Sequence, residues 1–528
     1  MARERRGKWD GRKAGAHEQA NLRYRFVKMG RDKLRDDGAA TKDREWIRSQ
    51  GLPGLVWIGQ MNIRFVVLSA FLMAVFTMGG TGRSDSESTL VLRPLSALVL
   101  GYGLLSLRRE QILVYRWLFG VAIAWVAMTL VQVIPLPVGL ADSLPGHGIV
   151  ADLDNLTGLR DGFRTISLTP VLTRSAFWAE MGPLAVLVLG VQLSRVEQNR
   201  LLPLIILIGL ASAMLGFMQI LGDANGDLYL YQDTNWGLPV GFFANRNHQG
   251  VFLACLVPML GVWWRDSEAY QGAGVSLRMV AALAAGVLLV PMILLTGSRT
   301  AVAILVLASL SLPLVSYRPK AVPTASSSDR RGGVLARMRT FAPFGFALVA
   351  VAVALAAVWV GRAPSLDRLF SSSVADDLRV QILPTVRAMI AQYWLLGSGL
   401  DSFGPVYRVN EPDSVLMPLM MNSAHDEWLE LIMTAGIPGV LVLTAVLGLW
   451  LSRIRILVAT ARSNSPPYFV RLGFVIFLFY LIASTTDYHV RDASISCMLV
   501  VLAIWMVSPS GGESAQGRRG LCCANLRD

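Results

Sequence analysis

The chain has 528 residues, of which 53% are hydrophobic and only 16% are charged, and its mean hydropathy is +0.49. Because a soluble domain carries about a quarter charged residues, this composition excludes an ordinary soluble protein. The formal net charge is +13, but the basic residues are spread over many short segments and a tail. A nucleic-acid partner is therefore a weak alternative, and attraction to anionic lipid head groups is the better interpretation of the charge.

Apolar segments of roughly 17–24 residues recur along the chain, and this is the length that crosses ~30 Å of hydrocarbon. The chain is therefore predicted to be an all-α polytopic membrane protein with about twelve transmembrane helices. In chain order, the predicted spans are residues 56–79, 90–106, 112–134, 175–193, 201–221, 248–264, 279–295, 300–316, 341–360, 430–451, 472–485 and 493–508.

Lysine and arginine determine the predicted orientation. They are concentrated in the N-terminal tail, in alternate loops and near the C-terminus, and segments of this kind stay in the cytoplasm. Both termini are therefore predicted to be cytoplasmic. The chain then divides into a basic cytoplasmic tail (1–55), nine spans (56–360), a long and partly helical external loop (361–429), three spans (430–508) and a second cytoplasmic tail (509–528). The first tail is predicted to be partly disordered, with a basic surface-lying helix as the alternative.

Ionisable residues gather at the predicted external ends of the spans. They are Arg246 and His248 at the sixth span, Arg299 between the seventh and eighth, Arg379 in the long loop, His425, Asp426 and Glu427 before the tenth, and Asp487, His489 and Arg491 between the last two. Arg299 is the most informative of these residues. A guanidinium in a tight apolar turn is costly unless it is paired or faces a cavity.

Several of these residues also have a purely structural interpretation. An N-cap at Asn247 would place His248 in the first turn of a helix. The acids at 426–427 suit a helix N-terminus, where the helix dipole favours negative charge. Asp487 and Arg491 could simply pair with each other.

Arginines that converge from separate loops on one external mouth predict an anion site, because guanidinium binds phosphate in a bidentate manner. At a membrane surface the natural anion is a lipid phosphate or pyrophosphate. A nearby histidine can take a proton from an attacking hydroxyl, since its pKa lies near working pH. The residues alone thus predict an external-face enzyme or carrier for a lipid-linked phosphate compound.

Four stretches, taken in order, resemble the motifs of a known superfamily. They are "GFFANRNHQG", "LTGSRTA", "LRVQILPTVRAMIAQYWLLGSGLDSF" and "SAHDEWLELIMTAGIPGVL". The chain resembles the O-antigen ligases and Wzy-type polysaccharide polymerases over about residues 56–507, most strongly over 241–440. The resemblance implies a C-type glycosyltransferase-like membrane fold that works without metal or cofactor. It also implies a glycan on undecaprenyl pyrophosphate as donor and an active site at the periplasmic face of the bacterial inner membrane.

The resemblance also implies roles for individual residues. The arginines Arg299, preceded by Ser298, and Arg379 would hold the pyrophosphate, and His425 would orient or deprotonate the acceptor hydroxyl. The remaining candidates for substrate binding are Asn245, Arg246, Asn247, His248, Asp426, Glu427 and His489, the last from the late "DYHV" motif. One departure is Asp426, which stands where the family usually has asparagine. Its carboxylate could raise the basicity of the imidazole or merely cap the following helix.

Three functions are compatible with this pattern. The first is polymerisation of lipid-linked repeat units into an exopolysaccharide or O-antigen, with a chain-length regulator and a flippase as expected partners. The second is a ligase that transfers the glycan to lipid A core or another acceptor. The third is a transporter of lipid-linked glycan, which would need gating segments near the membrane midplane and would gain nothing from His425.

Overall fold

The computed structural model describes residues 62–158, 162–267, 277–316, 345, 374–416, 421–460 and 467–508. The predicted tails and, apart from residue 345, the predicted span 341–360 lie outside these residues. Contacts divide the chain into two units, Met1–Ile63 and Arg64–Asp528. The second unit contains nearly all of the described residues, and the fold described below is that of this unit.

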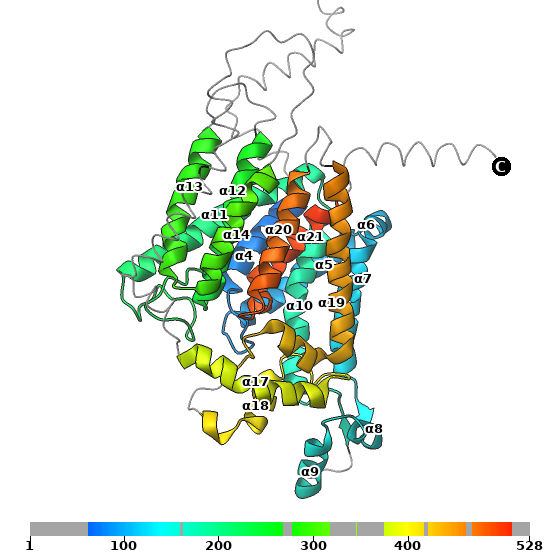
Figure 1. Cartoon of the computed structure of the whole chain (residues 1–528). Coiled ribbons are helices and arrows are strands. Elements are labelled where there is room, and N and C mark those ends of the chain that lie inside the picture. Colours follow the sequence, from blue (N-terminus) through cyan, green and yellow to red (C-terminus); the bar gives the residue numbers. More distant parts are fainter. Residues whose placement is uncertain are drawn as a thin grey trace, which may run out of the picture. The chain divides into compact units, whose positions relative to one another are not determined.

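Long helices form most of the structure (Figure 1). They are α4 (Ile63–Met78), α5 (Thr89–Ser106), α6 (Arg109–Val114), α7 (Arg116–Gln132), α10 (Pro170–Gly190), α11 (Arg195–Leu221), α12 (Arg246–Ser267), α13 (Leu277–Leu295), α14 (Arg299–Ser316), α19 (Glu427–Thr460), α20 (Tyr468–Ala483) and α21 (Ala493–Val507). Apart from 341–360, every predicted span coincides with one of these helices, because an apolar segment of this length satisfies its backbone polar groups internally only as a helix.

Six of the described helices are long and apolar enough to cross a membrane: α5, α10, α11, α13, α14 and α19. The helices α4, α7, α20 and α21 are apolar but shorter. Helix α12 has 22 residues but begins and ends with polar ones. The structure is therefore that of a helical, polytopic membrane protein, and the number of twelve spans stays a prediction.

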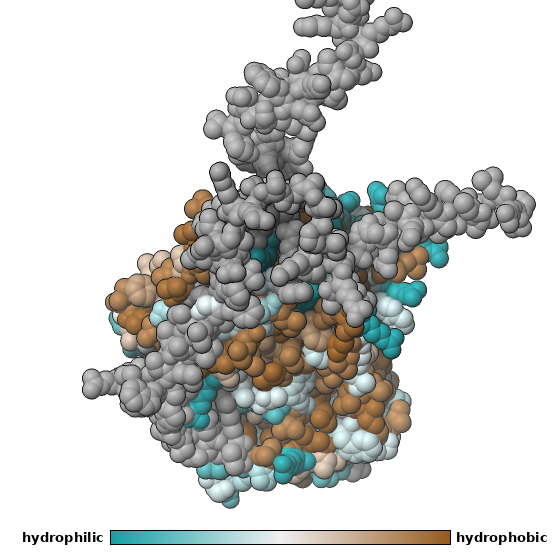
Figure 2. Space-filling model, turned by 45° about the horizontal axis from the view of Figure 1, so that its top comes forward, coloured by the Kyte–Doolittle hydropathy of each residue, from teal (hydrophilic) through white to brown (hydrophobic). Residues whose placement is uncertain are grey.

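Exposed apolar side chains cover much of this unit. Leu98 and Leu105 on α5, Leu207 on α11 and Leu288 on α13 are all more exposed than buried. In Figure 2, hydrophobic residues also occupy much of the surface that the grey atoms leave visible. Contiguous apolar surface of this extent fits contact with lipid.

Helix α12 lies at the centre of one half of the bundle and packs against α11, α13, α14 and α20. Every residue from Gly250 to Leu260 is buried, which is the pattern of a helix surrounded by other helices. In the other half, α10 packs against α5, α7 and α21. This packing fixes the start of α12 beside the connection between α20 and α21.

Smaller elements lie at the end of the bundle where α14, α19 and α21 begin (Figure 1). They are the two-stranded antiparallel sheet of β1 (Leu136–Pro137) and β2 (Phe163–Arg164), α8 (Val138–Asp142), α9 (Gly148–Thr157), α17 (Val374–Tyr393), α18 (Phe403–Asn410), and the short 3-10 helices η3 (Asp413–Val415) and η4 (His489–Arg491). A second apolar core joins α17 to α18 and includes Ile382, Met389 and Tyr407. These elements come from the predicted external loops.

Helix α19 is kinked near its start, and the kink positions the residues that precede it. Gly436 has φ 59° and ψ −152°, a conformation that essentially only glycine adopts. The turn at Ser398 and Gly399 packs into the kink, where the two backbone N–H groups donate to the carbonyl oxygens of Met433 and Thr434, each at 3.0 Å. The first two turns of α19 are thereby held against the segment that connects α17 to α18.

Candidate functional site

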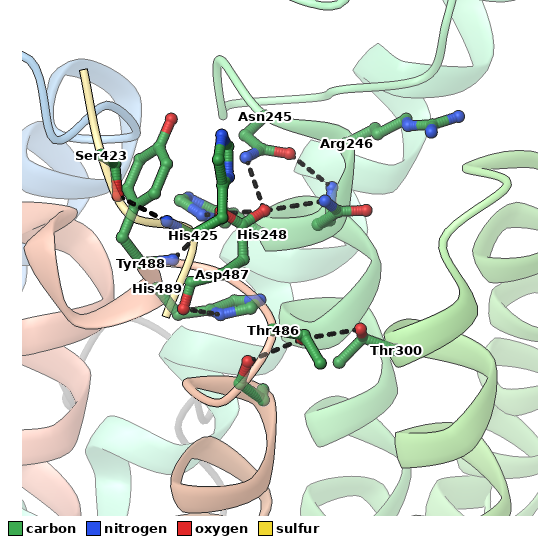
Figure 3. A network of polar contacts seen from close by, with 12 residues as sticks. Asn245, Arg246, His248, Thr300, Ser423, His425, Thr486, Asp487, Tyr488 and His489 are labelled. Carbon is green, nitrogen blue, oxygen red and sulfur yellow. Dashed lines mark hydrogen bonds and ion pairs between the residues drawn. The ribbon is translucent and has the colours of Figure 1, made fainter. Parts of the chain in front are cut away.

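Several of the predicted polar residues meet around Asp487, in the connection between α20 and α21 (Figure 3). One oxygen of Asp487, Oδ2, accepts hydrogen bonds from the side-chain amides of Asn245 (2.9 Å) and Asn247 (2.7 Å). The other, Oδ1, accepts from the backbone N–H of Tyr488 (3.0 Å) and lies 3.1 Å from Nδ1 of His425. One buried carboxylate thus joins three segments that are far apart in the sequence.

The residues around Asp487 stabilise the ionised form of its carboxyl group. Burial alone would raise the pKa of this carboxyl, but the hydrogen bond with His425 and the positive charge of His248 hold the pKa well below its usual range. A carboxylate can only accept, so Nδ1 of His425 must carry the proton in this hydrogen bond. Its other nitrogen, Nε2, is then the one left to accept a proton, and the side chain is 24% exposed.

The backbone around His425 is held in an unusual conformation. Its φ of 53° lies in the left-handed region, which costs a non-glycine residue roughly 1–2 kcal/mol. The hydroxyl of Ser423 accepts from the backbone N–H of His425 at 3.2 Å. Next to it, Asp426 accepts from the backbone N–H groups of Trp428 (3.0 Å) and Leu429 (3.1 Å). Asp426 therefore caps α19, and the carboxylate that contacts the imidazole is Asp487.

Two glutamates connect the first turn of α19 to neighbouring segments through hydrogen bonds and an ion pair. Glu427 accepts from the Ser484 hydroxyl (2.7 Å) and from the backbone N–H of Val490 (3.3 Å). Glu430 accepts from Ser423 and forms an ion pair with Arg491. Arg491 therefore pairs with Glu430, and the alternative in which it pairs with Asp487 is wrong.

His248 and His489 are buried beside the connection that carries Asp487. His248 is 1% exposed, and its Nδ1 lies 2.6 Å from a carboxylate oxygen of Asp492. The rings of His248 and His489 have centroids 4.6 Å apart. Burial, together with repulsion from His248, lowers the pKa of the fully buried His489 to about 3, so this imidazole is neutral. Both histidines position the Asp487 connection, and their burial keeps them from direct contact with a substrate in this conformation.

The start of α12 is capped differently from the sequence prediction. The side-chain oxygen of Asn245, not of Asn247, accepts the backbone N–H of Asn247 at 2.9 Å. The Asn247 side chain is instead used as a donor to Asp487. The backbone N–H of Arg246 donates to Asn235 at 2.9 Å, and its guanidinium extends away from the Asp487 network in Figure 3.

The start of α14 is attached to the same connection. The hydroxyls of Thr300 and Thr486 are 2.8 Å apart, which joins the residue after Arg299 to the residue before Asp487. Ser298 is buried and caps α14, because its hydroxyl accepts the N–H of Ala301 at 3.2 Å. The side chain of Arg299 is exposed at the helix start. The role predicted for this guanidinium in holding pyrophosphate stays a prediction.

Arg379 falls in α17, but its side chain lies outside the part of the chain whose side chains the structure describes. Its proposed contact with pyrophosphate stays a prediction. Among the described residues, no group of three or more His, Cys, Asp or Glu side chains is arranged to hold a metal ion.

Sequence reasoning named Asp487 as an ionisable residue and as a possible partner of Arg491, but not as a candidate for catalysis or substrate binding, although it is the hub of the network. Sequence reasoning also predicted no role for the glycines that follow α4. The backbone N–H of Gly80 donates to the Tyr231 hydroxyl (2.8 Å), and its carbonyl accepts from Ala244 (2.8 Å). A side chain on Gly80 would collide with the carbonyl oxygen of Phe242, at 2.0 Å. The glycine-rich "MGGTG" segment is the sequence feature that could have predicted this close contact between backbones.

Comparison with known families now adds to this geometry. Residues 284–444 match the model of a family described as O-antigen ligase. The matched segment runs from α13 into α19. The resemblance to the O-antigen ligase and Wzy-type superfamily is thereby confirmed, and the match supports a membrane enzyme of the polysaccharide polymerase or ligase type. No curated protein matches the chain.

The matched segment holds only part of the site. It includes Arg299, Arg379 and His425, whereas Asn245 and Asn247 precede it and Asp487 follows it. The matched segment thus contains the histidine, and the connection between α20 and α21 supplies the carboxylate bonded to it.

Proposed function

We propose that the chain polymerises oligosaccharide repeat units carried on undecaprenyl pyrophosphate into a surface or secreted polysaccharide. The reaction takes place at the periplasmic face of the inner membrane, with both termini in the cytoplasm. The observation that carries this proposal is the buried, ionised Asp487 bonded to His425 beside the start of α14. The family match supports the general class of enzyme.

The network suits a proton transfer at His425. With Nδ1 donating to Asp487, Nε2 accepts the proton of the acceptor hydroxyl as that oxygen attacks the anomeric carbon of the donor sugar. The bond between the anomeric carbon and the pyrophosphate oxygen breaks, and the pyrophosphate leaves with the electron pair. Asp487 stabilises the imidazolium that forms. Arg299 and Arg379 neutralise the negative charge that develops on the leaving group.

Ligase activity would use the same residues with another acceptor, such as lipid A core. Accumulation of single repeat units on lipid in a deletion strain supports the polymerase, whereas accumulation of long lipid-linked polymer supports the ligase. The expected partners of the polymerase are a flippase and a chain-length regulator. The reaction proposed here uses neither a metal nor a cofactor.

Purified protein in liposomes, supplied with lipid-linked repeat units, tests the proposal directly. The wild type should extend the glycan, and the His425→Ala variant should not, although it inserts into the bilayer. Translocation of the lipid without any extension would instead establish a transporter. Polymer yield from His425→Ala equal to that of the wild type would refute the assignment of His425.

A further inference from the structure

A cavity of about 570 Å³ lies among α5, α7, α10, α19, α20 and α21. Its volume falls in the range of about 300–1,000 Å³ that is usual for ligand sites. Most of its wall is apolar, with Trp125, Leu431, Val446, Phe477 and Leu499 among the lining residues. None of Asn245, Arg299 and His425 lines it. The cavity is therefore a site separate from the one proposed for the donor pyrophosphate.

The cavity follows the helices over a long distance. On α21 it is lined from Ala493 to Val507, a rise of about 21 Å at 1.5 Å per residue. On α19 it is lined from Glu427 to Arg453. About 21 Å exceeds half of the ~30 Å hydrocarbon thickness of a bilayer. This shape fits an extended apolar chain better than a compact solute.

Several polar residues of the lining lie at one end, where α5, α19 and α21 begin. They include Arg83, Ser84, Arg93, Asp401 and Arg491. Two of the guanidinium groups are paired with carboxylates: Arg83 with Asp85 and Asp233, and Arg491 with Glu430. Arg453 lines the cavity near the other end of α19, so Arg93 is the remaining arginine of the lining at the end where α5 begins.

The guanidinium of Arg93 is hydrogen-bonded to an uncharged hydroxyl group. Its Nη2 donates to the hydroxyl of Ser175 at 2.7 Å, and among the described residues no carboxylate lies within ion-pair distance of it. Asp401 is near enough to act on Arg93 and Arg491 through its charge, but it forms no ion pair with Arg93. A guanidinium facing a cavity mouth in this state has donors left for an anion, and phosphate is the anion that it binds best in a bidentate manner.

We propose that this cavity binds a second long-chain phosphate lipid, with its apolar chain between the helices and its phosphate at Arg93. This inference rests on the proposed function in one respect, namely that the bound lipid would be the lipid-linked acceptor. The connection between α20 and α21 brings the two sites together, since it presents Asp487 to His425 and Arg491 to the cavity. A glycan attached to a phosphate at Arg93 would extend from the end of the cavity that Arg491 lines.

The test uses the purified full chain in nanodiscs with a polyisoprenyl diphosphate that carries a photoreactive diazirine on its chain. Peptides labelled by light should come from α10 and α21. Arg93→Gln should reduce this labelling several-fold. Arg174→Gln is the matched control, because Arg174 is an exposed arginine of the same region that does not line the cavity.

A second pair of variants tests the apolar part of the cavity. Ala179 lines the cavity on α10, so Ala179→Phe should block labelling by filling the space. Ala124 on α7 is exposed outside the cavity, and Ala124→Phe should leave labelling unchanged. Unaltered labelling in both Arg93→Gln and Ala179→Phe would overturn the proposal.

The outcomes separate this proposal from the polymerase proposal, because labelling requires no turnover. If the wild type makes no polymer but labelling depends on Arg93 and Ala179, the lipid site stands and the polymerase proposal fails. If the wild type makes polymer and labelling is indifferent to both substitutions, the polymerase stands and the lipid site fails.

Discussion

Asp487 and His425 are 62 residues apart in the sequence, yet a carboxylate oxygen of the first lies 3.1 Å from Nδ1 of the second. Asp487 reaches this position because the amides of Asn245 and Asn247 bind its other oxygen. The pair has the arrangement of a base and the acid that orients it, in which the carboxylate fixes the tautomer of the imidazole. The Asn motif thus acts on His425 through Asp487.

Asp487→Asn should lower the rate of glycan extension by about 10²–10⁴-fold, the usual contribution of general acid–base catalysis. The amide keeps the shape of the side chain but loses the charge that stabilises the imidazolium. The rate of extension in liposomes, measured over a range of lipid-linked substrate concentrations, should show the loss in kcat rather than in KM.

Asp413→Asn is the matched control for this substitution, because Asp413 is an exposed aspartate of η3 on the same side of the bundle. It should extend glycan at the rate of the wild type. A loss confined to KM in Asp487→Asn would show that Asp487 serves binding and not the chemical step.

His489 should make the stability of the protein depend on pH. Its pKa is lowered to about 3 by burial and by His248, whereas an unfolded chain has a histidine pKa near 6.5. Protonation therefore favours the unfolded chain between these values, so stability is full above about pH 6.5 and falls as the pH drops toward 3. Between pH 7.5 and pH 5 the wild type should lose about 2 kcal/mol more than His489→Gln, because about 1.4 kcal/mol is lost per pH unit below 6.5. Thermal unfolding in detergent at the two pH values measures the difference, and equal losses would contradict it.

Asp426 should prove to be a structural residue. Asp426→Ala removes the cap of α19 and should cost about 1 kcal/mol of stability. Asp426→Asn keeps a capping oxygen and should be close to the wild type in both stability and rate of extension. A large fall in rate for Asp426→Asn, at unchanged thermal stability, would mean that this charge acts on the imidazole after all.

Gly436 should tolerate no side chain. Its backbone conformation costs a non-glycine residue about 1–3 kcal/mol, and an added Cβ would lie 2.6 Å from the backbone nitrogen of Gly397. Gly436→Ala should therefore lower the temperature of unfolding. Gly448 lies on the same helix with nothing within 4 Å of an added Cβ, so Gly448→Ala should raise stability slightly. The prediction fails if the two variants unfold at the same temperature.

The sequence predicted the helices well because hydropathy and length are local properties, and α11 or α14 could be recognised without any partner. It did not predict the kink at Gly436, because that conformation depends on the packing of the turn around Gly397. Similarly, Asp487 becomes a hub only when segments on either side of the matched domain meet. The exposure of the Arg299 side chain could not be predicted either, because the direction of a side chain in a short turn depends on where the next helix begins.

Arg299 and Arg379 should contribute to departure of the pyrophosphate. Arg299→Gln and Arg379→Gln should each lower the rate of extension by about 10²–10³-fold, the usual loss when one donor to a developing anion is removed. Arg299→Lys should fall between the wild type and the glutamine variant, because an ammonium keeps the charge but loses the bidentate geometry. Arg408→Gln is the control, since Arg408 is an exposed arginine of α18 at the same end of the bundle. Extension rates with lipid-linked repeat units in liposomes decide the matter. If Arg408→Gln loses as much activity as the other two, general positive charge at this surface, and not a cradle for the leaving group, drives the reaction.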